Sequence, residues 1–179
     1  NLIVWGFIFI VLIIKLAGSI RIVPTQSAFI VERFGKYKNT LEPGFHLLVP
    51  FIEKVAFVQP LKEEAVNVPP QNCFTKDNVQ VEVDGVLYLQ VVDAVNASYG
   101  VTDYHFAATQ LAQTTTRAVI GLLELDRTFE ERDEINSRVV QVLQKAAHQW
   151  GLEVKRFEVK NIVPPPSIKE SMEKQMSAE

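Results

Sequence analysis

The chain has 179 residues, of which 47% are hydrophobic and 22% charged, and its formal net charge is −3. This length suits one ordinary domain with short extensions, and an acidic net charge excludes the general basic field typical of nucleic-acid-binding proteins. The single cysteine, Cys73, excludes an internal disulfide and fits a reducing compartment.

The first predicted element is an apolar helix over residues 1–20. Residues 2–14 contain no charged or polar side chain, Lys15 interrupts the run, and Arg21 follows it. The run is apolar on every face, which suits lipid better than packing on one side only. The segment is therefore predicted to be a membrane anchor, whose lipid-contacting residues are Leu2, Trp5, Phe7, Phe9, Leu12 and Ile14.

A signal peptide and a buried core helix are the alternatives for this segment. A signal peptide begins with a basic region and ends at a small-residue cleavage site, and here only "KLAGS" resembles such a site. Lys15 and Arg21 lie on the C-terminal side of the apolar run, so the positive-inside rule predicts that the rest of the chain is cytoplasmic.

Short β segments are predicted after the anchor. "SAFIVERFGKY" (residues 27–37) is typical of a strand that ends at Gly35, and Pro43-Gly44 predicts a turn. The apolar loop at residues 47–52 has two interpretations: it packs in the core, or it contacts the membrane interface beside the anchor. On the second interpretation the interface residues are Leu47, Leu48, Phe51 and Ile52.

Residues 79–91 carry the clearest strand pattern, because apolar side chains occupy the odd positions and polar ones begin the even positions. "KDN" at residues 76–78 predicts the hairpin turn before this strand. Asp84-Gly85 could form a further hairpin, but the alternation passes through it unchanged. One long, bulged strand is therefore predicted.

The second half of the sequence predicts helices. Asp103 is a candidate cap for a helix running to about Leu123, and Thr128 with Glu131 forms a candidate capping box for the next helix. Gly151 is predicted to stop that second helix. Its buried face, read from spacings of three and four, is predicted to hold Ile135, Val139, Val142, Ala146 and Trp150.

Residues 152–163 predict one more strand, whose apolar phase shifts near Arg156. The prolines at 164–166 form a rigid spacer, and "SIKE" from Ser167 is a second candidate capping box. The helix that follows is expected to associate with other copies through an apolar seam. This oligomerisation seam consists of Ile168, Met172 and Met176.

The sequence contains no Gly-rich phosphate loop, H-E-x-x-H, C-x-x-C or G-x-S-x-G motif. His46, His105 and His148 are far apart, and the acidic cluster at residues 130–134 is expected to be a solvated helix start. We therefore expect no enzyme, cofactor or metal site. The alternatives are a membrane-tethered hydrolase or protease subunit, and a channel component, which a span without a carboxylate disfavours.

Four segments carry a family resemblance that covers nearly all residues from 22 to 179. They are "VERFGKY…LEPGFHLLVPFIEKV", "TKDNVQVEVDGVLYLQVVDAVNASYGV", "QLAQTTTRAVIGLLELDRTFEERDEIN" and "WGLEVKRFEVKNIVPPPSIKESMEKQMSAE". These segments resemble the SPFH/Band 7 superfamily of stomatins, prohibitins and flotillins. The resemblance is to its paraslipin branch, which includes stomatin-like protein 2 of mitochondria and the bacterial membrane protein QmcA.

The resemblance implies an α+β fold in three parts: an anchor at 1–20, an SPFH domain of mostly antiparallel sheet and packed helices at 21–163, and the first turns of a long coiled-coil helix at 164–179. It implies a scaffold that forms rings or cages, organises membrane microdomains and regulates membrane proteins. Expected partners are lipid, further copies, a membrane-bound AAA+ protease and an NfeD-like membrane protein. An apolar span at the visible N-terminus favours the bacterial inner (plasma) membrane over the mitochondrial inner membrane.

Overall fold

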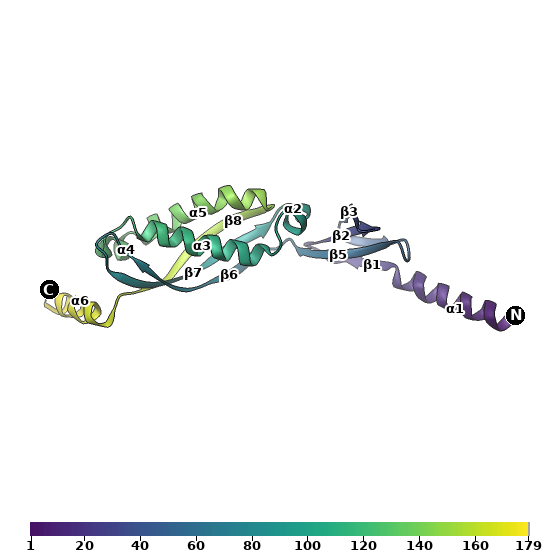
Figure 1. The fold of residues 1–179 in the computed structure, drawn as a ribbon, viewed down its shortest axis with the longest axis horizontal. Coiled ribbons are helices and arrows are strands. Elements are labelled where there is room, and N and C mark those ends of the chain that lie inside the picture. The colour runs from purple at the N-terminus through teal and green to yellow at the C-terminus, as the bar shows by residue number, and fades with distance from the viewer. Residues whose placement is uncertain (179) are drawn as a thin grey trace.

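The computed structural model describes residues 1–178, which form an elongated molecule with α1 (Leu2–Gly18) at one end and α6 (Pro166–Ala178) at the other (Figure 1). Two lobes lie between these helices. The first lobe contains β1 (Ile20–Val23), β2 (Ser27–Arg33), β3 (Lys36–Leu41), β4 (Gly44–Leu47) and β5 (Glu53–Pro60). The second lobe contains β6 (Glu64–Phe74), β7 (Gln80–Val91), α2 (Ala94–Tyr99), α3 (Tyr104–Ile120), α4 (Leu125–Glu130), α5 (Arg132–Gln149) and β8 (Leu152–Val163).

Helix α1 (Leu2–Gly18) has 17 residues, and none of them is buried. Its C-cap is Ser19, whose hydroxyl donates to the Leu16 carbonyl at 2.6 Å and so satisfies one of the free carbonyls at the helix end. Among residues 1–178, no helix combines the length and hydropathy of a membrane-crossing segment.

All strand pairs in the described chain are antiparallel, which confirms the predicted α+β class with mostly antiparallel sheet. The first lobe holds a two-stranded sheet, β1-β4, and a three-stranded sheet, β3-β2-β5. Its own core is small. We call this cluster the small core, and its buried members are Val23, Val31, Leu41 and Leu48.

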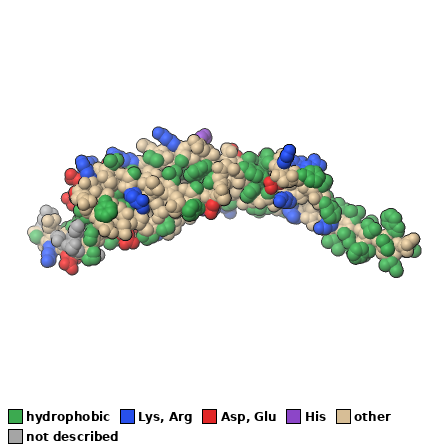
Figure 2. Space-filling model, viewed as in Figure 1, with side chains coloured by type: hydrophobic (Ala, Val, Ile, Leu, Met, Phe, Trp, Pro, Cys, Tyr) green, Lys and Arg blue, Asp and Glu red, His purple; other side chains and the backbone are tan. Residues whose placement is uncertain are grey.

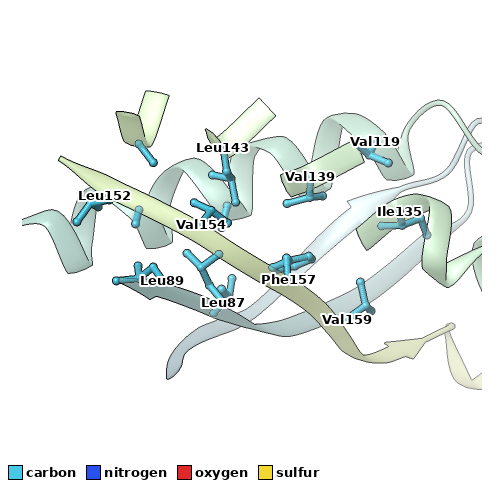
Figure 3. Packing of buried hydrophobic residues seen from close by; sticks show 14 of the residues in the cluster. Leu87, Leu89, Val119, Ile135, Val139, Leu143, Leu152, Val154, Phe157 and Val159 are labelled. Carbon is cyan, nitrogen blue, oxygen red and sulfur yellow. The ribbon is translucent and has the colours of Figure 1, made fainter. Parts of the chain in front are cut away.

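The second lobe is a three-stranded sheet, β6-β7-β8, with α3 and α5 along one face (Figure 1). Side chains from α5, β7 and β8 meet between helix and sheet, among them Leu143, Leu87 and Phe157 (Figure 3). We call this the main core, and Ala28 and Ile30 of β2 extend it into the first lobe. Burial of this many apolar side chains is the dominant stabilising term in such a fold.

Strand β7 confirms the prediction of one long strand through Asp84-Gly85. The pairing of β7 with β8 shifts register between these two residues, as expected for a bulge. A Cβ at residue 85 would lie 2.8 Å from the Phe157 ring and from the Glu158 carbonyl. Glycine is therefore required here by close packing rather than by a hairpin turn.

Helix α3 confirms Asp103 as its cap, since that carboxylate accepts a bond from the Phe106 N–H at 3.2 Å. The helix ends at Ile120, before the predicted Leu123. The capping box at Thr128 is wrong: Thr128 is buried within α4, and its hydroxyl donates to the Leu125 carbonyl. The short helix α4 takes up these residues because Leu125 packs into the main core.

The buried face of α5 is also partly different from the prediction. Ile135 and Val139 are buried as expected, but the face continues with Leu143 and Ala147, while Val142 is 48% exposed. A strict spacing of four slants across the surface of a helix, whereas the predicted mixture of three and four runs along its axis. The buried row of α5 therefore follows the line along which the helix packs on the sheet, not the axis of the helix. The predicted members Ala146 and Trp150 are half-buried at the side of this face.

Helix α5 stops as predicted at Gly151, whose φ of +69° is the left-handed conformation that favours glycine. The predicted phase shift in β8 is confirmed, because Leu152 and Val154 are buried before Arg156, and Phe157 and Val159 after it. Helix α6 (Pro166–Ala178) begins one residue before Ser167, which suits the fixed φ of proline at the first helical position.

Candidate functional site

The two-stranded sheet next to α1 exposes an apolar face. Ile20 pairs with Leu47 and Ile22 pairs with Phe45, so these side chains share one side of the sheet. Their exposed fractions are 41%, 66%, 73% and 63%, respectively. We call these four residues the apolar β1–β4 face. On the opposite side of this sheet, Val23 packs in the small core.

The apolar β1–β4 face follows α1 directly in the chain, because β1 begins two residues after that helix ends. Hydrophobic side chains cover α1 from end to end (Figure 2). An exposed apolar surface as extensive as that of α1 marks an interaction site rather than ordinary protein surface. Among the predicted lipid-contacting residues, Leu2, Trp5, Phe7, Phe9, Leu12 and Ile14 are all exposed.

The predicted interface loop at residues 47–52 divides between the two interpretations. Phe51 is 78% exposed and Leu47 is 66% exposed, so both are available to a membrane. Leu48 is only 7% exposed and packs in the small core, and Ile52 is half-buried. For Leu48 the prediction of surface exposure is therefore wrong, because the chain turns it inward beside Val23.

Sequence reasoning missed three members of the apolar β1–β4 face: Ile20, Ile22 and Phe45. A signal was present, because Ile20 and Ile22 alternate with Arg21, and Phe45 and Leu47 alternate with His46. On sequence alone, Ile20 falls at the end of the predicted anchor, Phe45 follows the predicted turn, and Ile22 lies in no predicted element.

Charged groups border this end of the molecule. The Lys15 ammonium lies 5.1 Å from the centre of the Phe51 ring, within cation–π range. The Arg21 guanidinium donates to the Gly18 carbonyl at 2.8 Å. A hydrogen bond from Lys38 lowers the pKa of the Glu53 carboxyl, which also accepts from the Val49 N–H at 3.2 Å.

The three histidines lie on separate elements. His46 of β4 contacts the Glu42 carbonyl at 2.6 Å, and His148 of α5 is exposed. His105 of α3 lies 2.5 Å from the Glu64 carboxylate of β6. No group of three His, Cys, Asp or Glu side chains positioned to hold a metal occurs in residues 1–178.

The Glu64 carboxylate joins β6 to α3. It accepts a hydrogen bond from the Tyr104 hydroxyl at 3.0 Å, and the Tyr104 ring stacks on His105 with centroids 4.2 Å apart. Burial raises the pKa of Tyr104, and the neighbouring Glu64 charge raises it further. Tyr104 therefore stays a hydrogen-bond donor at neutral pH and holds the helix to the sheet.

The remaining candidate residues have structural surroundings. Cys73 is fully buried, and burial raises the pKa of its thiol although Arg117 lies nearby. A raised pKa disfavours the reactive thiolate. In the acidic cluster, the Arg127 guanidinium holds the pKa of the Glu131 carboxyl below its usual range. Asp133 and Glu134 lie in the first turn of α5 as predicted, whereas Glu130 ends α4 and Glu131 lies between the two helices.

The predicted oligomerisation seam on α6 is not uniform. Met172 is half-buried and packs against the main core, whereas Met176 is 71% exposed. The side chain of Ile168 lies outside the described part of the chain. At least one seam residue is therefore covered by the chain's own second lobe.

Residues 21–179 match the SPFH domain / Band 7 family. The chain is 48% identical over 160 residues to rat "Stomatin-like protein 2, mitochondrial", which covers 89% of this chain and 45% of the relative. The identity to "Stomatin-like protein stl-1" of Caenorhabditis elegans is 48% over 160 residues, or 89% of this chain and 49% of the relative.

An uncharacterized protein of Methanothermobacter thermautotrophicus is 45% identical over 172 residues, covering 96% of this chain and 54% of that protein. The chain thus spans about half the length of the curated relatives it matches. The match to the family model and the level of sequence identity both rest on the whole aligned segment, not on any single residue. The chain belongs to the SPFH domain / Band 7 family, in the stomatin-like paraslipin branch.

Proposed function

We propose that the chain is a subunit of a membrane scaffold, inserted in the bilayer through α1 and seated on its surface through the apolar β1–β4 face. The observation that carries this proposal is the exposure of apolar side chains both on α1 and on the two-stranded sheet that directly follows it. Full burial of one large apolar side chain contributes about 1.5–3 kcal/mol, so even partial burial of the four exposed side chains adds usefully to anchoring.

The charges give the proposal an orientation. Lys15 and Arg21 lie at the end of α1 that joins the body of the protein. Basic residues flanking an apolar segment favour the cytoplasmic side, so both lobes face the cytoplasm of a bacterial inner membrane in this proposal. In a mitochondrial inner membrane, the alternative location, the same rule applies to the matrix side.

Lateral assembly is the second part of the proposal. Copies held in one membrane plane meet at high effective concentration, so weak contacts sum to a stable ring or cage. The exposed Met176 on α6 and the unpaired edges of β3 and β6 are available for such contacts. A ring of this kind would organise a membrane microdomain and sequester membrane proteins, such as an AAA+ protease or an NfeD-like protein, with no catalytic step of its own.

The test is depth measurement in liposomes with the full chain. Phe45→Cys and, as a matched control, Phe106→Cys carry an environment-sensitive fluorophore; both native side chains are more than 60% exposed, and Phe106 lies on α3 of the second lobe. Buried Cys73 is replaced by serine in both. We expect lipid-borne quenchers to quench the probe at residue 45 and not at residue 106. Equal quenching at both positions, or at neither, would reject the proposed seating.

A further inference from the structure

A cavity of about 360 Å³ lies where α1 meets the first lobe. One wall is the last turn of α1 with Lys15, and the opposite wall is the loop that holds Val49 and Phe51. Arg21 and Glu53 complete the lining. The cavity therefore combines cations with apolar side chains, at the point where the apolar run of the helix ends.

The cavity carries a positive charge that the protein itself does not neutralise. Within the part of the chain that the structure describes, Lys15 makes no ion pair and only lies over the Phe51 ring. Arg21 uses one terminal nitrogen on the Gly18 and Ile20 carbonyls, at 2.8 and 3.1 Å. A guanidinium has five N–H donors, so others remain for a ligand.

The carboxylate in the cavity does not compete for these cations. One Glu53 oxygen is paired with Lys38, and the other accepts from the Val49 N–H at 3.2 Å. Its side chain is only 2% exposed. Lys38 balances this negative charge, which leaves Lys15 and Arg21 to face an incoming anion.

We infer that this cavity binds the phosphodiester of an anionic membrane phospholipid. The phosphate contacts Lys15 and Arg21, and the glycerol and first acyl carbons lie against Phe51 and Val49. The position of the cavity along α1 suits a lipid phosphate. The apolar run of α1 ends at Lys15, and lipid phosphates lie just outside the hydrocarbon core of a bilayer. Apolar walls beside the cations favour a lipid over a free phosphate ion.

The inference rests on the proposed insertion of α1, so its experiment keeps the two separable. The full chain is reconstituted in vesicles of equal phosphatidylcholine and phosphatidylglycerol, tested by flotation, and released in mild detergent for native mass spectrometry. The variants are Lys15→Gln, Lys15→Arg and the control Lys36→Gln, an exposed lysine on β3 outside the cavity.

We expect every variant to float with the vesicles and the control to retain phosphatidylglycerol as the parent chain does. Lys15→Gln should retain about fivefold less, which is the effect of one basic residue at an anionic surface, and Lys15→Arg should restore retention. Undiminished retention in Lys15→Gln would overturn the lipid site and leave membrane insertion standing. Failure of the parent chain to float would instead reject the proposed function.

Two further arms identify the source of the phosphate. Excess glycerol phosphate should leave the phosphatidylglycerol adduct in place; complete displacement would show a site for soluble phosphates and overturn the lipid assignment. Equal retention of phosphatidylcholine and phosphatidylglycerol would overturn the preference for an anionic headgroup. A thermal melt of each variant checks that the exposed substitution leaves the fold intact.

Discussion

The two lobes distribute their apolar residues in opposite ways. The second lobe buries its large side chains, such as Phe157 and Leu87, between a sheet and two helices. The first lobe buries few, and displays Ile22 and Phe45 on its surface. Stability and surface chemistry are therefore assigned to different lobes: the second lobe holds most of the buried core, and the first lobe exposes apolar side chains.

The largest expected effect comes from replacing one phenylalanine of each lobe by alanine and comparing the two losses of stability. Phe157→Ala empties the centre of the main core, where the side chain is 1% exposed, and should lower the free energy of unfolding by about 3–5 kcal/mol. Phe45→Ala removes an exposed ring and should change it by about 0.5 kcal/mol or less. Urea denaturation of both variants in detergent measures the difference. Similar losses would mean that the apolar β1–β4 face is part of a core.

A second prediction compares one glycine from each lobe. Gly151 and Gly35 both have positive φ, +69° and +79°, but a Cβ at 151 would lie 2.3 Å from the Asp93 carbonyl, whereas one at 35 meets nothing within 4 Å. Gly35→Ala should lower the free energy of unfolding by about 1–2 kcal/mol, because alanine disfavours the left-handed backbone conformation. Gly151→Ala should cost clearly more, because the turn must also move away from Asp93. Equal melting temperatures would contradict the close approach.

The third prediction separates stability from assembly along α6. Met172→Asp places a charge against the main core and should cost about 1–3 kcal/mol of unfolding free energy. Met176→Asp changes an exposed side chain and should leave that free energy within about 0.5 kcal/mol. If the seam assembles copies, Met176→Asp alone reduces oligomer mass in light scattering. An unchanged mass would place assembly on other surfaces.

The smallest expected effect is a pH dependence in the first lobe. Lys38 lowers the pKa of Glu53 below its ordinary value of 4.5. A depressed pKa in the folded state contributes stability above the unfolded pKa, and this contribution is lost as the pH falls through the folded pKa. Glu53→Gln should therefore narrow the stability difference between neutral and acidic pH. Lys38→Gln, the partner control, should do the same. An unaltered pH profile in both would show that the pair contributes nothing.

Local sequence patterns predicted the elements whose structure depends on neighbouring residues in the chain. The alternation in β7, the Asp103 cap and the stop at Gly151 follow from side-chain periodicity and backbone conformation over a few residues. The apolar character of α1 and the phase shift in β8 are of the same kind. Each was predicted correctly because no distant segment needs to be placed first.

Tertiary structure decided the features that join distant segments. Ile22 and Phe45 form one face only because β1 pairs with β4, and Thr128 is buried only because α4 packs on the main core. The exposure of Val142 likewise depends on the angle at which α5 crosses β8. Alternation in the sequence can mark each strand by itself, but it does not say which strands pair. Pairing register and helix orientation arise from the sum of many weak contacts across the core, between residues that are distant in the sequence.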